Sequence, residues 1–168
     1  MLTLGIDPGS KITGFGIVGG ENTCVMYENF KLSPKMDFAD KLNALHGRVI
    51  EIITAFHPTE MAIEKAFVFI NATTALKLGE VRGSLIAGVR NCTLPIYEYT
   101  PTSIKYSLTG YGRATKKEIK AAVENILHTK INEKGSDATD ALAIALCHIR
   151  HLKNLSQQNA RDVTNEHI

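Results

Sequence analysis

Four carboxylates at three separated points of the chain are the residues most able to do chemistry. Asp7 and Glu64 each follow an apolar run of residues. Asp137 and Asp140 stand three residues apart, where a helix is expected to begin. Ionised carboxylates repel one another, so a fold that gathers them needs a cation. A hard divalent ion such as Mg²⁺ meets that need and is commonly shared with a substrate phosphate. The four acids therefore predict metal-assisted chemistry on a phosphodiester.

Each of these acids, taken alone, also has an ordinary structural explanation. Asp7 opens the sequence Asp-Pro-Gly-Ser and could simply stabilise that turn. Acids in the first turn of a helix, such as Asp137 and Asp140, suit the helix dipole. Glu64 is harder to explain in this way, because a carboxylate at the end of a buried strand needs a partner or a function. The spacing of Asp137 and Asp140 also places both on one helix face, so the set of four predicts an active site more strongly than any single member.

Cysteines and histidines offer no competing metal site. The three cysteines, Cys24, Cys92 and Cys147, are far apart and form no Cys-x-x-Cys pair. Neither a disulfide framework nor a zinc site is therefore indicated. None of the six histidines has the spacing of a ligand set. With oxygen ligands alone, Mg²⁺ or Mn²⁺ is the expected ion.

A cluster of basic residues lies between positions 105 and 120. Five lysines or arginines there accompany a single acid, Glu118, which leaves a local excess of four positive charges. Such an excess suits a phosphate backbone, although a solvated helix face would have the same composition. The basic residues are Lys105, Arg113, Lys116, Lys117 and Lys120.

Apolar periodicity predicts the elements that must position these residues. The expected strands are 1–6, 12–18, 22–32, 60–64 and 94–99. The expected helices are 38–56, 71–89, one that begins at 100–101, 115–127 and 136–151. Hairpin strands followed by alternating strands and helices predict an α/β fold, with a five-stranded mixed sheet flanked by helices. The polar ends of neighbouring strands then form the natural ligand crevice.

The length of the chain corresponds to one domain. With 168 residues, of which 44% are hydrophobic, it can enclose one core but not two lobes. We expect a folded domain over 1–152, followed at 153–168 by a polar tail that is mobile or disordered. The sequence begins without a secretory leader, and no apolar stretch approaches the ~20 residues that cross a bilayer. A cytoplasmic location without membrane association is therefore expected.

A set of short motifs runs from residue 5 to about residue 148. They are 5–10 with Thr13 and Gly14, 62–64 with Phe67, 75–79 with Arg82 and Gly83, 99–101, 109–112 with Ala114 and Lys116, and 137–143. In identity and order they resemble the motifs of RuvC-type Holliday junction resolvases. One motif of this kind is weak, but an ordered set that covers nearly the whole domain is specific.

The resemblance implies both a fold and a function. The fold would be ribonuclease H-like, with three antiparallel strands followed by parallel ones. The function would be resolution of four-way DNA junctions in recombination and repair by a homodimer. Each subunit would nick one of two strands of like polarity and leave 5′-phosphate and 3′-hydroxyl ends. A branch-migration motor of the RuvA and RuvB type would be a partner.

The resemblance also implies roles for individual residues. Asp7, Glu64, Asp137 and Asp140 become the catalytic acids and the metal ligands. Two Mg²⁺ ions, with Mn²⁺ as a substitute, would orient a water and stabilise the leaving 3′-oxygen. The residues expected to contact DNA are Phe67, Lys77, Arg82, Lys105, Arg113 and Lys116.

Phe67 is expected to stack on bases at the open centre of the junction, because every base offers a π-face. It could instead fill the core. The surrounding run, 65–70, is unusually apolar for a loop. Such a patch is expected to meet bases, a second subunit, or both.

Three other functions fit parts of the sequence. A sugar kinase or actin-like ATPase also begins with a strand, an Asp and a Gly-rich turn, but it needs a second lobe that this length does not supply. A ribonuclease H-like nuclease acting on structured RNA would share the acids. A non-catalytic junction-binding protein would gain nothing from clustered negative charge next to phosphates.

Overall fold

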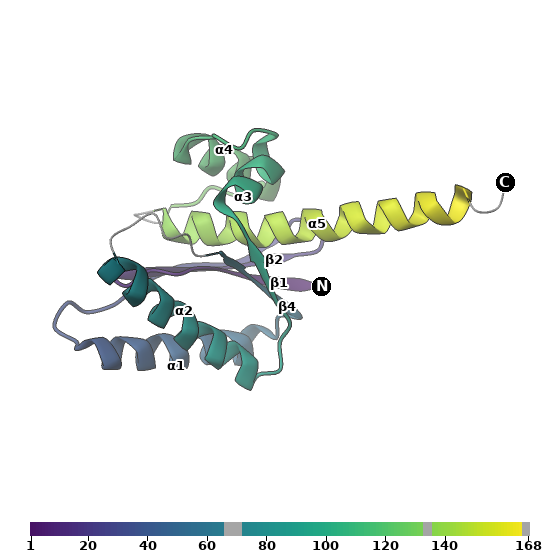
Figure 1. The fold of residues 1–168 in the computed structure, drawn as a ribbon. Helices are drawn as coiled ribbons and strands as arrows, with labels where there is room; N and C mark the ends of the chain where they lie inside the picture. Colours follow the sequence, from purple (N-terminus) through teal and green to yellow (C-terminus); the bar gives the residue numbers. More distant parts are fainter. Residues whose placement is uncertain (66–71, 133–135, 166–168) are drawn as a thin grey trace.

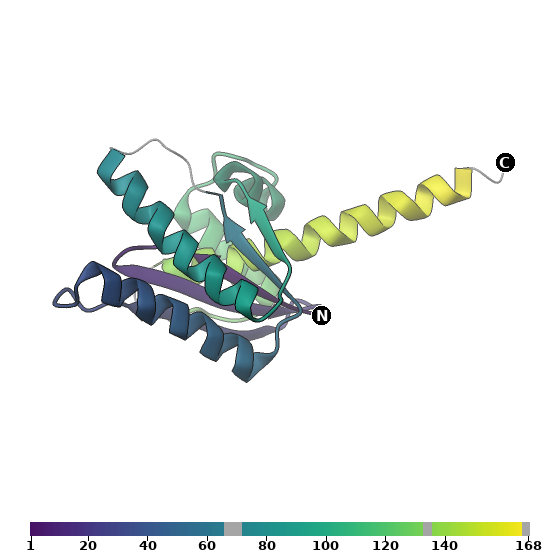
Figure 2. The same cartoon turned by 60° about the horizontal axis from the view of Figure 1, so that its bottom comes forward.

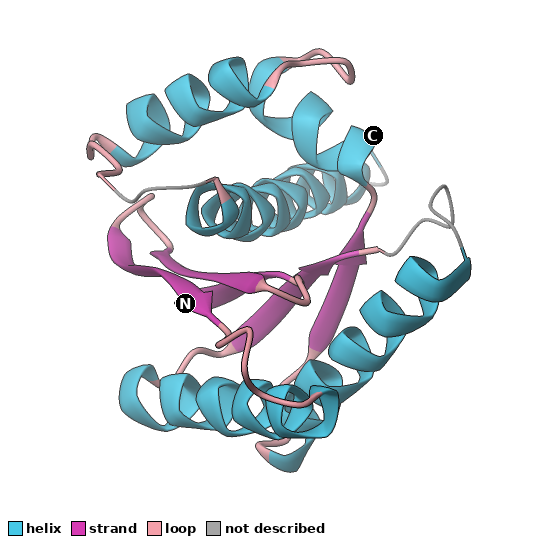
Figure 3. Ribbon diagram, turned by 90° about the vertical axis from the view of Figure 1, so that its left-hand side faces the viewer, coloured by secondary structure: helices cyan, strands magenta, loops and turns pink. Residues whose placement is uncertain are grey.

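The computed structural model describes residues 1–65, 72–132 and 136–165. A central sheet lies between two groups of helices (Figures 1 and 3). In chain order the elements are β1 (Leu2–Asp7), β2 (Ile12–Gly19), β3 (Cys24–Lys31), α1 (Phe38–Phe56), β4 (Glu60–Glu64), α2 (Ala72–Asn91), β5 (Ile96–Tyr99), α3 (Pro101–Thr109), α4 (Lys116–Leu127) and α5 (Asp137–Asn165).

The sheet is mixed, and its five strands follow the order β3-β2-β1-β4-β5. β3, β2 and β1 are antiparallel neighbours, whereas β4 pairs in parallel with both β1 and β5. This confirms the predicted α/β fold with antiparallel strands followed by parallel ones. Because Ile6 of β1 lies opposite Ile63 of β4, the next residues, Asp7 and Glu64, reach the same edge of the sheet.

Strand alternation divides the interior into two cores. Leu4 and Ile6 of β1 are fully buried in the core that contains the apolar residues of α1 and α2. The opposite face of the sheet packs against α3, α4 and α5. Figure 1 shows this arrangement, with α1 and α2 below the sheet and the other three helices above it. The sheet is therefore covered on both faces, and only its edges and strand ends reach the surface.

Helix α5 lies directly on the backbone of β1 and β2, because glycines line this part of the sheet. A Cβ atom on Gly5 would stand 2.0 Å from the carbonyl oxygen of Ala141. A Cβ atom on Gly14 would stand 1.9 Å from the carbonyl oxygen of Asp137. Only glycine allows so close an approach of two backbones. The backbone of the sheet therefore sets the position of the first turn of α5.

A buried histidine joins the middle of α5 to the sheet. His148 is fully buried, and its Nδ1 lies 2.7 Å from the hydroxyl of Tyr99. Its Nε2 is hydrogen-bonded to the carboxylate of Glu60, and its ring stacks on Tyr97 at a centroid distance of 4.3 Å. These contacts bind α5 to β4 and β5, so the helix is held at both its start and its middle.

The last helix is longer than the sequence pattern predicts. It continues to Asn165 and projects beyond the sheet (Figure 2), so the prediction that it ends at His151 is wrong. Apolar periodicity fades after that residue, but no glycine or proline interrupts the helix, and polar side chains are compatible with a solvated helix. The boundary at residue 152 between a domain and a tail stays a prediction. Within the described ranges, no helix has both the length and the apolar character that a membrane crossing requires.

Candidate active site

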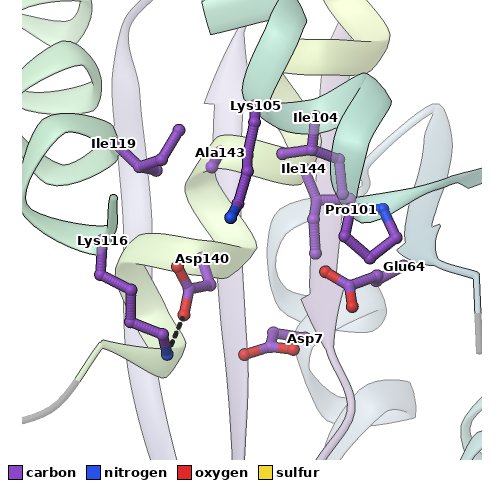
Figure 4. A pocket seen from close by; sticks show the side chains of 10 residues that line it. All are labelled: Asp7, Glu64, Pro101, Ile104, Lys105, Lys116, Ile119, Asp140, Ala143 and Ile144. Carbon is purple, nitrogen blue, oxygen red and sulfur yellow. Dashed lines mark hydrogen bonds and ion pairs between the residues drawn. The ribbon is translucent and has the colours of Figure 1, made fainter. Parts of the chain in front are cut away.

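Three of the four predicted acids line one cavity. Asp7 is the last residue of β1, Glu64 is the last residue of β4, and Asp140 lies in the first turn of α5. Figure 4 shows their carboxylates directed into a common space, whose volume is about 230 Å³. The lining residues are Asp7, Glu64, Pro101, Ile104, Lys105, Lys116, Ile119, Asp140, Ala143 and Ile144.

Asp137 stands next to this group and is not among the residues that line the cavity. It is the first residue of α5 and is half-buried. Its charge nevertheless contributes to the raised pKa of Asp7. The structure therefore brings Asp7, Glu64 and Asp140 together and keeps Asp137 within electrostatic reach of them.

Two polar side chains hold the backbone next to these acids. Thr13 closes the turn after Asp7, because its hydroxyl donates to the carbonyl of Gly9 at 2.9 Å and accepts from the amide of Gly9 at 3.2 Å. Asn29 of β3 accepts a hydrogen bond of 2.7 Å from the amide of Ala138 at the start of α5. Sequence reasoning missed both roles. Thr13 lay within a recognised motif, whereas Asn29 gives no local signal.

Burial and mutual repulsion weaken the acidity of Asp7. Its pKa is raised well above the ordinary value of 3.8, first by burial and then by the charges of Asp140, Glu64 and Asp137. The ammonium of Lys116 acts in the opposite direction and lowers this pKa. A carboxylate in this condition gains most from a nearby cation.

The pKa of Glu64 is shifted in both directions by its surroundings. Burial raises its pKa, and the charge of Asp140 raises it further. Lys116, Arg82 and Lys105 lower it. The acids of the site thus lie among basic side chains from three different helices, α2, α3 and α4.

Lys116 contacts the acids directly. Its Nζ donates to Oδ2 of Asp140 at 3.2 Å and to Oγ of Ser136 at 2.9 Å. Burial lowers the pKa of Lys116, but the charge and the hydrogen bond of Asp140, together with the charges of Asp7 and Asp137, raise it. Lys116 starts α4 after a capping box formed by Thr115 and Glu118. This cap fixes the direction of the helix and therefore the origin of the lysine side chain.

The other residues expected to contact DNA lie in different surroundings. Lys105 of α3 lines the cavity next to the acids (Figure 4). Arg113 and Lys77 are exposed, and the Nζ of Lys77 stands 5.9 Å from the centroid of the Phe38 ring. Phe67 lies outside the described residues.

Arg82, which the resemblance assigns to DNA contact, is largely buried. Only 8% of the residue is exposed. Its guanidinium donates to the backbone carbonyl of Glu64 and to the carboxylate of Glu98. The reason is the rotation of α2, which turns Arg82 inward together with Val81 and Leu85.

The donor set fits a hard divalent cation. Asp7, Glu64 and Asp140 supply only oxygen ligands. The neighbouring carboxylates add to burial in raising the pKa of Asp7, so a cation would stabilise the ionised group. Over the described ranges, no three acidic, histidine or cysteine side chains already stand in metal-ligand geometry. The hydrogen bond from Lys116 to Asp140 occupies a carboxylate oxygen that an ion would share. Binding of an ion therefore requires these side chains to shift.

The family model for the crossover junction endodeoxyribonuclease RuvC matches residues 3–148. The chain belongs to the RuvC family. The RuvC of Pelotomaculum thermopropionicum is 38% identical over 154 residues, which cover 90% of this chain and 94% of the relative. The RuvC of Hydrogenovibrio crunogenus is 43% identical over 155 residues, which cover 89% of this chain and 87% of the relative. As a RuvC-family member, the protein is a Holliday junction resolvase and a crossover junction endodeoxyribonuclease. Members of this family use divalent metal ions.

Solved structures agree with the RuvC assignment. The Thermus thermophilus RuvC structure has a TM-score of 0.83 at 32% identity and covers 91% of this chain and 96% of its own. The same protein in complex with Holliday junction substrate has a TM-score of 0.84 at 33% identity, with coverages of 90% and 94%. The yeast mitochondrial resolvase Ydc2, with a TM-score of 0.65 at 15% identity, shares the fold. The fold is ribonuclease H-like, as predicted.

Proposed function

We propose that this resolvase nicks two strands of like polarity at a four-way DNA junction, one strand in each subunit of a homodimer, and leaves 5′-phosphate and 3′-hydroxyl ends. The observation that carries the proposal is the cavity in which Asp7, Glu64 and Asp140 converge beside Lys105 and Lys116. Acids that can hold cations, next to lysines that can face a phosphate, suit hydrolysis of a phosphodiester. The Thermus thermophilus relative bound to a Holliday junction substrate supports the choice of DNA.

The proposed ions are two Mg²⁺ per site, with Mn²⁺ as a substitute, held by Asp7, Glu64, Asp137 and Asp140. When bound, they supply Lewis-acid stabilisation of the phosphodiester and lower the pKa of the attacking water. The side chains of the site perform the remaining tasks. Asp7 would be a central ligand of these ions, and Lys116 holds the carboxylate of Asp140 in position through its hydrogen bond.

The proposed DNA surface extends from the cavity along the basic residues. Lys105 and Lys116 line the cavity beside the acids and would face the phosphate that is cut. Exposed Arg113 and Lys77 would contact the backbone further away, and Phe67 would stack on bases. Arg82 is left out of this surface because it is buried.

The proposed dimer contact is the exposed face of α2. Leu76 is 66% exposed on this helix, and Gly79, Gly83 and Ala87 continue the same stripe. A Cβ atom on Gly79 or Gly83 would meet open space within the subunit. Glycine inside a helix costs roughly 0.5–1 kcal/mol relative to alanine, and close packing of a second α2 would offset that cost.

A motor of the RuvA and RuvB type as a partner and a cytoplasmic location complete the proposal, both by family resemblance.

The decisive experiment is cleavage of a synthetic four-way junction by the Asp7→Asn variant. We expect its Mg²⁺-dependent cutting rate to fall about a hundredfold or more, because a ligand of the ion is lost. Binding of the uncut junction should change little. Asp40→Asn, at an exposed position of α1, is the matched control and should cut normally.

Two further substrates test the substrate class in the same assay. A linear duplex of the same sequence and a four-way junction made of RNA should both remain uncut. If Asp7→Asn cuts the DNA junction at the normal rate, the metal assignment is wrong. Equal cleavage of the RNA junction would contradict the DNA specificity.

A further inference from the structure

Arg82 ties three segments together behind the cavity. Its guanidinium donates to the backbone carbonyl of Glu64 at the end of β4 and to the carboxylate of Glu98 in β5. The side chain of Arg82 is only 10% exposed, whereas that of Glu98 is 42% exposed. A buried guanidinium is tolerated only when its hydrogen-bonding groups are satisfied. The two acceptors therefore fix the arginine between α2 and the sheet.

Arg82 donates to the carbonyl of Glu64, the last residue of β4 that pairs with β5. Glu64 pairs with Tyr99 of β5, and the amide of Lys65 donates to the carbonyl of Tyr99 at 2.8 Å. Glu64 is the last residue of β4. The peptide of Glu64 is thus fixed on one side by β5 and on the other by α2, while its carboxylate projects into the cavity (Figure 4).

Arg82 also acts on Glu64 through its charge. Lys105 and Lys116 face the cavity, where DNA and ions would enter. Arg82 supplies its charge from the protein interior, so it persists whatever occupies the cavity.

We propose that Arg82, held by Glu98, is a positioning residue for the metal site. It fixes the end of β4 so that the carboxylate of Glu64 faces Asp7 and Asp140. The inference rests on the proposed metal-binding role of these acids. It replaces the role in DNA contact that the sequence suggested for Arg82.

The test compares Arg82→Met with wild type in three measurements. The first is binding of Mn²⁺ to the protein without DNA. The second is the Mg²⁺ concentration that gives half-maximal cleavage of the junction. The third is junction affinity without Mg²⁺ over a range of salt concentrations. Methionine retains much of the side-chain volume and removes both hydrogen bonds.

A positioning role predicts a selective change. Residues that orient metal ligands typically contribute about 10-fold or more to metal affinity or activity, so Mn²⁺ binding should weaken and the half-maximal Mg²⁺ concentration should rise by about 10-fold. Junction affinity should stay within about twofold, with the same salt dependence, because no phosphate contact is lost. Arg82→Lys should recover part of the loss, since an ammonium can still donate to the carbonyl of Glu64.

Arg48→Met is the matched control. Arg48 also bridges two acids, Glu28 and Glu51, but it does not line the cavity. It should leave both metal measurements unchanged. If Arg82→Met proves unstable, Glu98→Gln removes the charged partner from a half-exposed position and should shift the Mg²⁺ requirement in the same direction.

Two results would overturn the inference, and a third would contradict the proposed function instead. If Arg82→Met and Arg48→Met give the same Mn²⁺ binding and the same half-maximal Mg²⁺ concentration, Arg82 is not a positioning residue. A loss of junction affinity with a weaker salt dependence, at unchanged metal binding, would identify Arg82 as a DNA contact. A failure of wild type to bind Mn²⁺ would instead contradict the proposed function, and Asp7→Asn would reveal that separately.

Discussion

Asp7 is the acid whose charge the metal-free fold tolerates least. It is the last residue of the central strand β1. Burial and the negative charges of Asp140, Glu64 and Asp137 raise its pKa. Repulsion of this kind lowers the stability of the metal-free protein and favours the metal-bound one. The same residue therefore weakens the empty site and strengthens the occupied one.

The raised pKa of Asp7 predicts how stability depends on pH. Because the folded chain holds this proton more tightly than the unfolded chain, the associated stability is present below the ordinary value of 3.8 and is lost as pH rises through the folded-state pKa. At neutral pH we expect metal-free Asp7→Asn to melt at a higher temperature than wild type. The difference should shrink as the solution is acidified toward that ordinary value. Thermal unfolding followed by circular dichroism in chelator measures both effects, and a lower melting temperature at neutral pH would contradict them.

At the residue scale, the sequence indicated that the acids lie at the ends of strands and at the start of a helix. It did not indicate which side chains hold the backbone next to them. Asp7 and Glu64 follow apolar strands, and such strand ends are visible in a local pattern. The inward orientation of Arg82 depends on how α2 rotates against the sheet, and the contact of Asn29 joins residues far apart in the chain. A local pattern contains neither relation.

At the element scale, glycines in the sheet set the position of the first turn of α5, and a buried histidine holds its middle. Gly5 and Gly14 let its first turn rest on the sheet backbone, and His148 holds its middle. The spacing between Asp7 and Asp140 thus depends on an absence of side chains in β1 and β2. The sequence predicted the helix and its start, but its end at Asn165 could not be found, because apolar periodicity stops where the helix leaves the protein body.

The Gly14→Ala variant tests whether the close contact between β2 and α5 sets the position of the helix. The added methyl would meet the carbonyl oxygen of Asp137 at 1.9 Å, so the start of α5 must move. We expect a loss of about 1–3 kcal/mol in the free energy of unfolding, as for other overpacked sites, and a larger proportional loss of cleavage. Urea unfolding and junction cleavage measure the two effects.

Gly47→Ala is the matched control, because a Cβ atom there meets nothing within 4 Å. As an alanine within helix α1, it should stabilise the protein by roughly 0.5–1 kcal/mol and leave cleavage unchanged. Normal cleavage by Gly14→Ala would show that the contact between β2 and α5 does not set the geometry of the acids.

At the scale of the whole molecule, the described chain contains one catalytic cavity, whereas resolution of a four-way junction needs two cuts. The proposed homodimer would supply the second site, with the exposed stripe on α2 as its contact. Arg82 belongs to the same helix and turns inward to the carbonyl of Glu64. One helix would therefore serve the subunit contact on one side and the active site on the other.

Gly83→Arg tests the dimer. The side chain would extend into open space in a single subunit but would obstruct close packing of two α2 helices. Sedimentation of wild type should give about twice the chain mass of 18.4 kDa, and the variant should approach the single mass. Its paired nicking should decline to single, uncoordinated nicks. Asn43→Arg, at an exposed position of α1, should remain dimeric; a dimeric Gly83→Arg would exclude this face as the contact.

The place of α5 in the chain also governs when the enzyme can become active. During translation, the sheet and the acids of β1 and β4 leave the ribosome well before Asp137 and Asp140 do. Until α5 settles on Gly5 and Gly14, the nascent protein lacks two of its four carboxylates. A chain interrupted before α5 would lack two of the four proposed metal ligands, so we expect cleavage of DNA to begin only after synthesis has passed this helix.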